Sequence, residues 1–247
     1  MKLIKEIFGR IWALWGAVVF ITTMLIFMVP FLLFCYFKKD PAKTIRFTKW
    51  SKYWIDSFLL LILSPLKIKG RENFVAGENY IVLCNHNSFM DVPITTPAIP
   101  GGNKTIAKIE LSRMPVFGLI YKTGSVLVDR KSDVSRKESY SKMKDVLDMG
   151  LHMCLYPEGT RNKTDQPLRP FHNGAFRLAL DAEKSIIPSL IFNTRKVLPA
   201  DKIFYAMPHR LEIHFLEPVV ALAGETAEDL RERVFKVMFD YYLKHAK

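Results

Sequence analysis

A run of 27 residues without a charged side chain, from Ile11 to Phe37, constrains this chain more than any other feature. A helix of that length can cross the roughly 30 Å hydrocarbon layer of a bilayer. A secretory signal is disfavoured, because its apolar region is shorter and ends at a small-residue cleavage site. A buried core helix would rarely be so uniformly apolar. We therefore expect residues 1–65 to form a membrane-associated helical anchor that ends near Pro65.

The surroundings of this apolar run leave two membrane geometries open. Basic residues flank both ends, and basic flanks favour the cytoplasmic side of a membrane. Pro30 lies inside the run and is expected to break or kink a helix there. One geometry is a single tilted span, and the other is a hairpin that enters one leaflet and returns. We favour the hairpin, because it keeps both basic flanks on one side.

The segment that follows, residues 42–65, is expected to be a helix in the lipid interface. Its aromatic residues fall on one side at helical spacing, and its basic residues lie mostly elsewhere, which suits an interfacial helix. The aromatic residues are Phe47, Trp50, Trp54 and Phe58. The alternative is that this aromatic face packs on the folded domain.

The charge distribution indicates an anionic membrane surface as a partner. The formal net charge is +12, and the first 70 residues hold 11 Lys and Arg against 3 Asp and Glu. Basic residues concentrated beside an apolar segment favour anionic lipid over nucleic acid. The three cysteines lie in separate apolar runs, which predicts buried thiols and neither disulfides nor a metal site. The histidines show no zinc-ligand spacing.

Residues 66–247 alternate between short apolar runs and longer helix-like segments. Strands are expected at 66–69, 80–84, 105–107, 125–128, 151–156, 186–192 and 211–216. Helices are expected at 92–98, 110–122, 134–149, 171–183 and 227–245. A capping box of Thr226 and Asp229 precedes the last helix. This order predicts an α/β domain with a mixed, mostly parallel sheet flanked by helices.

The strand at 80–84 ends in a polar turn that carries His86, with Asp91 five residues later. The two side chains can touch if His86 sits in the turn and Asp91 in the first helical turn. A carboxylate on one ring nitrogen holds histidine in one tautomer and makes it a better base, able to take a proton from a hydroxyl. The alternative is structural, because Ser88 and Asp91 also have the spacing of a helix capping box.

Other polar clusters follow later strands in the same way. Lys108 ends one strand, Asp129 and Arg130 end another, and the turn Glu158-Gly-Thr-Arg161 ends a third. If these strands are neighbours in a parallel sheet, the clusters gather with His86 at one edge. Arginine and lysine there would suit a phosphate beside a hydroxyl. Ordinary salt bridges would explain each cluster taken singly.

In this order and spacing, the motifs resemble those of the glycerolipid acyltransferases. They are Asn85-His86-x4-Asp91, the block from Gly124 to Arg130, Tyr156-Pro-Glu-Gly-Thr-Arg161, and Ile187-Pro188 in a late apolar strand. The resemblance covers about residues 65–220 and is closest to the bacterial 1-acyl-sn-glycerol-3-phosphate acyltransferases. Tyr156 stands where Phe is common, and we do not expect this to alter chemistry.

The resemblance implies acyl transfer from a thioester, acyl-coenzyme A or acyl carrier protein, to the 2-hydroxyl of lysophosphatidic acid, giving phosphatidic acid. His86, oriented by Asp91, would act as the general base. The thioester is a co-substrate, and no cofactor or metal is implied. The location implied is the inner membrane, with the catalytic domain on the cytoplasmic face. The implied substrate-binding residues are Lys108, Arg130, Glu158, Gly159, Thr160 and Arg161.

Three other functions remain to be separated from this one. The nearest is acylation of glycerol-3-phosphate or of a lysophospholipid with a larger headgroup. A second is a non-catalytic lipid carrier at the membrane surface, for which His86 would be dispensable. A third, suggested by the basic charge, is nucleic-acid binding, but the sequence contains nothing like an aromatic and basic nucleic-acid module.

Overall fold

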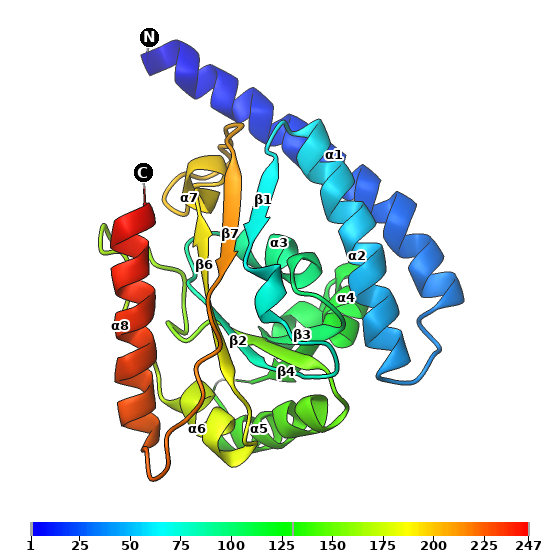
Figure 1. Cartoon of the computed structure of the whole chain (residues 1–247). Coiled ribbons are helices and arrows are strands. Elements are labelled where there is room, and N and C mark those ends of the chain that lie inside the picture. Colours follow the sequence, from blue (N-terminus) through cyan, green and yellow to red (C-terminus); the bar gives the residue numbers. More distant parts are fainter. Residues whose placement is uncertain (1, 130, 247) are drawn as a thin grey trace.

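The computed structural model describes residues 2–129 and 131–246 as a helical hairpin packed on an α/β domain (Figure 1). The hairpin consists of α1 (Lys2–Phe34) and α2 (Ala42–Leu61), which run in opposite directions side by side. The domain follows after Pro65, where the first strand begins. An ion pair joins Asp40, in the turn of the hairpin, to Lys104 in the sheet, with 2.7 Å between Oδ2 and Nζ.

The domain is built on a seven-stranded sheet in the order β1-β7-β6-β2-β5-β3-β4. Only the β6–β7 pair is antiparallel among the pairs that the structure describes, so the predicted mixed, mostly parallel sheet is confirmed. The strands are β1 (Leu66–Lys69), β2 (Ile81–Cys84), β3 (Asn103–Lys108), β4 (Ser125–Val128), β5 (His152–Leu155), β6 (Ile186–Phe192) and β7 (Leu211–Phe215).

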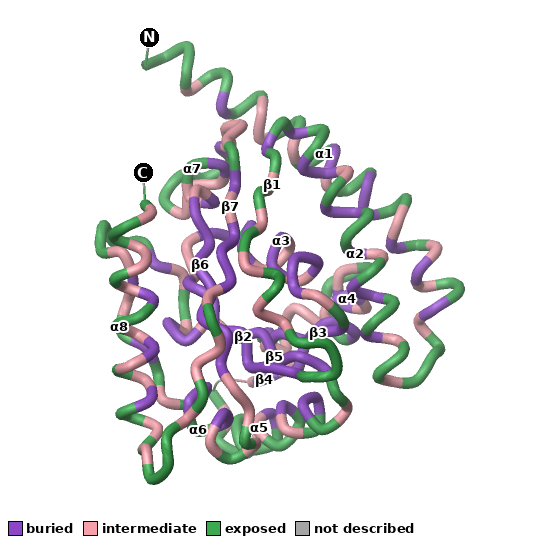
Figure 2. The backbone as a smooth tube through the Cα atoms, in the orientation of Figure 1, coloured by how far each residue is buried: buried purple, intermediate pink, exposed green. Residues whose placement is uncertain are grey.

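Helices cover both faces of the sheet, and each face has its own apolar core. The hairpin lies with α3 (Asp91–Ala98) and α4 (Phe117–Gly124) on one face. The other face is covered by α5 (Asp133–Asp148), α6 (Gly174–Asp181) and α8 (Ala227–His245). Alternate residues of β2 serve the two cores, because successive side chains of a strand point to opposite faces. The central strands are accordingly buried along their length (Figure 2).

Short helices complete the chain and correct one prediction. They are η1 (Arg71–Asn73), η2 (Ile109–Arg113) and α7 (Thr194–Val197). The helix expected at 110–122 is divided into η2 and α4, because Pro115 cannot donate a helical hydrogen bond and Val116 has a φ of 60°. The capping box of Thr226 and Asp229 at the start of α8 is present as predicted.

The apolar run of the sequence forms one continuous helix. The expectation that Pro30 breaks this helix is wrong, since α1 continues to Phe34, and the alternative of a kink stays a prediction. Met28 and Phe31, on either side of the proline, are completely buried, and their packing offsets the lost hydrogen bond. The chain reverses between α1 and α2, in a turn that begins at Cys35, near the end of the run. By length and composition α1 could cross a membrane. In its most apolar stretch of 18 residues, 28% is buried inside the protein.

The aromatic face of α2 packs inward, so the prediction that it lies in lipid is wrong. Phe47, Trp54 and Phe58 are buried in the core shared with α1 and the domain. The indole Nε1 of Trp54 donates to the carbonyl oxygen of Phe20 at 3.3 Å. Apolar side chains exposed on the hairpin come mainly from α1 instead, among them Ile4, Ile11, Leu14 and Ile21. The exposed part of α1, visible in Figure 2, therefore carries most of the exposed apolar side chains of the hairpin.

Candidate active site

The sheet edge places His86 in a turn and Asp91 at the start of a helix. Asn85 closes β2 by bonding across to β6: its amide donates to the carbonyl oxygen of Ile191 at 3.0 Å, and its oxygen accepts from the amide of Ile191 at 2.7 Å. The chain then leaves the sheet, and α3 begins at Asp91. His86 Nδ1 lies 2.8 Å from Asp91 Oδ2, so the pair predicted from the sequence is formed.

Asp91 serves the histidine and the turn at the same time. Its Oδ2 also accepts the backbone amides of Asn87 at 2.6 Å and Ser88 at 2.7 Å. The carboxylate has no solvent exposure, whereas the His86 side chain is 19% exposed. A carboxylate acceptor puts the ring proton on Nδ1, which leaves Nε2 with a lone pair on the side open to a ligand. The capping box of Ser88 and Asp91 is not formed, because the N-cap of α3 is Met90 without a side-chain cap, but Asp91 does hold the turn through the Ser88 amide.

Glu158 fixes the backbone of the histidine. One carboxylate oxygen accepts the His86 amide at 2.7 Å, and the other accepts the Arg169 amide at 3.0 Å. The His86 carbonyl oxygen in turn accepts the Asn162 amide at 2.6 Å. Burial raises the pKa of Glu158 to about 7. These contacts make Glu158 a positioning residue, and its predicted contact with a substrate stays a prediction.

Tyr156 supports His86 in a way that sequence reasoning missed. Its ring packs against the imidazole of His86, with 4.6 Å between the ring centroids. This contact restricts the histidine from the side of β5, while Asp91 holds it from α3. The signal that could have found it is the adjacency of β2 and β5, because both residues follow the ends of those strands.

The Glu-Gly-Thr-Arg turn brings Arg161 next to the histidine turn. The guanidinium of Arg161 lies over the ring of Phe89, 3.5 Å from its centroid, and Phe89 is itself 68% exposed. Gly159 has a φ of +69°, and a Cβ there would come within 2.8 Å of the His172 ring. Glycine is therefore required at 159, and Thr160 beside it is exposed.

Lys108, a further predicted cation, lies along the same edge of the sheet. Strands β2, β5, β3 and β4 are consecutive parallel neighbours, as the clustering argument required. Lys108 ends β3 and is exposed, and within residues 2–129 and 131–246 no hydrogen bond or ion pair involves its side chain. Arg130 lies outside the described residues. No three His, Cys, Asp or Glu side chains among the described residues are grouped to hold a metal ion.

A cavity of about 320 Å³ opens on the apolar side of the histidine turn. Phe89 and Met90, from the turn, form part of its wall, and Trp12, Phe20 and Phe58 of the hairpin form another part. Its lining is almost wholly hydrophobic, which suits an acyl chain. The hairpin therefore shapes a space that begins beside His86.

A histidine–carboxylate pair at the carboxyl edge of a mostly parallel sheet, beside an arginine and an apolar cavity, can make a hydroxyl nucleophilic by removing its proton. Residues 65–192 match the family model "Acyltransferase". The chain belongs to the acyltransferase family.

Relatives and a solved structure agree with this assignment. The chain is 31% identical to 1-acyl-sn-glycerol-3-phosphate acyltransferase of Helicobacter pylori, over 74% of this chain and 76% of that protein. It is 33% identical to the enzyme of that name from Cocos nucifera, over 53% of this chain and 42% of the relative. With the mouse alpha enzyme the identity is 29% over 67% of this chain and 58% of the relative, so the chain spans about half the length of these two relatives.

The solved structure is the 1-acyl-sn-glycerophosphate acyltransferase PlsC from Thermotoga maritima. It superposes with a TM-score of 0.75 over all of this chain and 99% of that one, at 24% sequence identity. This likeness establishes the shared fold, including the helical hairpin.

Proposed function

We propose that the chain transfers a fatty acyl group from a thioester donor to the 2-hydroxyl of 1-acyl-sn-glycerol-3-phosphate and so makes phosphatidic acid. The observation that carries the proposal is the 2.8 Å His86–Asp91 pair, with Arg161 and the apolar cavity on either side of the same turn. The names of the relatives support the choice of acceptor.

In the proposed reaction, Nε2 of His86 removes the proton from the acceptor hydroxyl as its oxygen attacks the thioester carbonyl carbon. Asp91 stabilises the imidazolium that forms. The tetrahedral intermediate collapses, the carbon–sulfur bond breaks, and the thiolate takes the proton from His86. The products are the ester and the free thiol, and His86 returns to its starting state.

The acceptor is a lipid with one phosphate and one acyl chain, and the site offers a counterpart for each. Arg161 would bind the phosphate, with the Gly159–Thr160 backbone and Lys108 as further contacts. Because Arg161 lies on Phe89 and Phe89 lines the apolar cavity, phosphate and chain can be bound on opposite sides of one aromatic ring. Glycerol-3-phosphate has no chain to use this cavity, which favours the lysophospholipid.

The hairpin would hold this site at the membrane surface. The exposed apolar face of α1 would enter one leaflet of the cytoplasmic membrane, and the domain would lie on the cytoplasmic side. A one-tailed acceptor could then present its headgroup to His86 while its tail stays in apolar surroundings.

The test uses the purified full chain in detergent micelles with a labelled acyl-thioester donor. Lysophosphatidic acid, glycerol-3-phosphate and lysophosphatidylcholine are offered in turn, and product formation is followed by thin-layer chromatography. We expect turnover with lysophosphatidic acid and its loss in His86→Ala. Preferential acylation of another acceptor, or lipid transfer that survives His86→Ala, would contradict the proposal and favour another acceptor class or a lipid carrier.

A further inference from the structure

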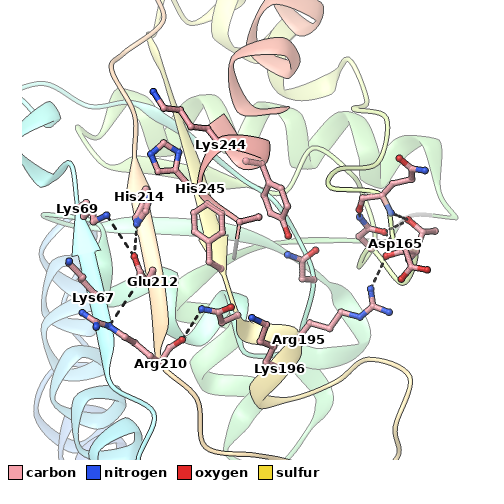
Figure 3. Close-up of a pocket in the computed structure, with 18 residues that line it drawn as sticks. Lys67, Lys69, Asp165, Arg195, Lys196, Arg210, Glu212, His214, Lys244 and His245 are labelled. Atoms are coloured by element: carbon pink, nitrogen blue, oxygen red, sulfur yellow. Dashed lines mark hydrogen bonds and ion pairs between the residues drawn. The ribbon is translucent and has the colours of Figure 1, made fainter. Parts of the chain in front are cut away.

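A second and larger cavity, of about 760 Å³, lies on the polar side of the histidine turn (Figure 3). Its walls come from β1, β7, α7, the end of α8 and the loop at 162–166. Of the residues predicted from sequence to bind substrate, none of those that the structure describes lines it. Its volume falls within the range of sites that hold cofactor-sized ligands.

The lining of this basic cavity is strongly cationic. Six lysine or arginine side chains face two carboxylates, and they are Lys67, Lys69, Arg195, Lys196, Arg210 and Lys244. The Glu212 carboxylate lies 2.9 Å from Nε2 of His214, 3.9 Å from Nζ of Lys69 and 4.0 Å from Nε of Arg210. Its negative charge is therefore already balanced by these neighbours. A concave surface with this excess of positive charge concentrates anions.

Two of these cations are available to a ligand. Within the described ranges 2–129 and 131–246, neither Lys67 nor Lys244 has an acidic side chain within 4.0 Å, and both are exposed. They come from β1 and α8, on different walls of the cavity. Arg195 is different, because it donates to the carbonyl oxygens of Thr164 and Lys163 and holds the neighbouring loop. Cations on separate walls suit an anion with several phosphates better than a single phosphomonoester.

The basic cavity also offers a flat aromatic surface. Tyr242 and Phe192 both line it, and their rings stack with 5.3 Å between centroids and 24° between planes. Aromatic faces of this kind bind the planar base of a nucleotide by stacking. Phosphate-binding cations and a stacking face together indicate a phosphorylated nucleotide.

The basic cavity is joined to the active site through the histidine turn itself. Asn87, the residue after His86, lines it, and so does Asn162, whose amide donates to the His86 carbonyl oxygen. Phe89 and Met90, two and three residues further along, line the apolar cavity. The turn that carries His86 therefore stands between an apolar space and a cationic one.

The proposed function assigns the apolar space to the chain of the acceptor, and a thioester donor carries a phosphorylated group on the sulfur side of its reactive carbonyl that would suit the cationic one. Given the function proposed above, we propose that the basic cavity binds the 3′-phosphoadenosine diphosphate half of acyl-coenzyme A. Lys67 and Lys244 bind its phosphates, Tyr242 stacks on its adenine, and the pantetheine arm passes Asn87 to bring the thioester to His86.

The test compares two double variants that remove the same charge. Lys67→Ala/Lys244→Ala changes the cavity, and Lys142→Ala/Lys236→Ala changes exposed lysines on α5 and α8 that do not line it. Binding of coenzyme A and of adenosine 3′,5′-bisphosphate to the full chain in detergent is measured by titration calorimetry. We expect the cavity variant to bind coenzyme A roughly tenfold more weakly for each lysine removed, about 1.4 kcal/mol each. The control variant should bind like the wild type.

A second readout ties binding to the reaction. The wild-type preference for acyl-coenzyme A over acyl-pantetheine, which lacks all of these phosphates, should fall by the same factor in Lys67→Ala/Lys244→Ala. Equal coenzyme A affinity in the cavity and control variants would overturn the proposal. The proposal would also be overturned if the wild type did not bind coenzyme A and if Lys67→Ala/Lys244→Ala were impaired only with acyl carrier protein as donor. That result would indicate a protein donor.

Binding is also measured in His86→Ala, which separates this proposal from the proposed function. If coenzyme A binding depends on Lys67 and Lys244 but the wild type does not acylate lysophosphatidic acid, the coenzyme A site is supported and the proposed acceptor is rejected. If the wild type acylates lysophosphatidic acid but coenzyme A binding does not depend on these lysines, the proposed acceptor is supported and the coenzyme A site is rejected.

Discussion

Glu158 is a buried acid whose ionisation should make the stability of this protein depend on pH. Burial raises the pKa of Glu158 to about 7 from its ordinary value of 4.5. A difference of about 2.5 pKa units corresponds to about 3 kcal/mol. Because the folded state holds the proton more tightly, unfolding becomes easier as the pH rises from 4.5 through 7. The contribution of Glu158 to stability is therefore fully present below pH 4.5 and is lower by about 3 kcal/mol above pH 7.

The variant Glu158→Gln isolates this effect. Glutamine is isosteric and does not ionise, so it should remove the contribution of position 158 to the pH slope. It offers only one oxygen, whereas the ionised glutamate accepts both the His86 and the Arg169 amides. One of these buried amides then loses its acceptor, at a cost of roughly 1–3 kcal/mol, and turnover should fall because the His86 backbone is less well fixed.

The assay is urea unfolding of both proteins in the same detergent at several pH values from 4.5 to 8. The free energy of unfolding of the wild type minus that of Glu158→Gln should decrease by about 3 kcal/mol across this range. Other titrating groups cancel in the difference, since they are common to both proteins. A difference that stays constant with pH would refute the reasoning, and so would one that increases.

Four further changes test other parts of the account. Asp91→Asn should lower kcat by roughly 10²- to 10⁴-fold, since a neutral amide lacks the negative charge that stabilises the His86 imidazolium, and steady-state kinetics on the folded variant will show it. Tyr156→Phe keeps the ring on His86 and should leave kcat within about twofold, whereas Tyr156→Ala should destabilise the protein by roughly 3–5 kcal/mol. Gly159→Ala should lower the unfolding free energy by about 1–2 kcal/mol in urea, because φ is +69° and His172 is in the way. Leu14→Lys with Ile21→Lys, at side chains 56% and 50% exposed, should reduce co-sedimentation with vesicles without changing the far-ultraviolet circular dichroism.

The His86–Asp91 pair could be predicted from sequence because one strand–turn–helix unit contains both residues. Its geometry follows from where β2 ends and α3 begins, which are local features. The role of Glu158 could not be predicted in the same way. It depends on β2 and β5 being neighbours in the sheet, 72 residues apart in the chain, and no local pattern specifies that pairing.

The hairpin shows a second limit of sequence reasoning. A helix face that packs on protein and one that packs on lipid carry the same apolar residues, so Phe47, Trp54 and Phe58 gave no means of telling them apart. The basic cavity was missed for a related reason. Lys67, Arg210 and Lys244 are scattered in the sequence as ordinary surface cations, and only the fold brings them to one space.

The central claim is that His86 removes the proton from the acceptor hydroxyl. The most direct measurement is the kcat of His86→Ala on lysophosphatidic acid, with thermal unfolding as the control for an intact fold. We predict a fall of roughly 10²- to 10⁴-fold at an unchanged unfolding temperature. Turnover equal to that of the wild type would contradict the account.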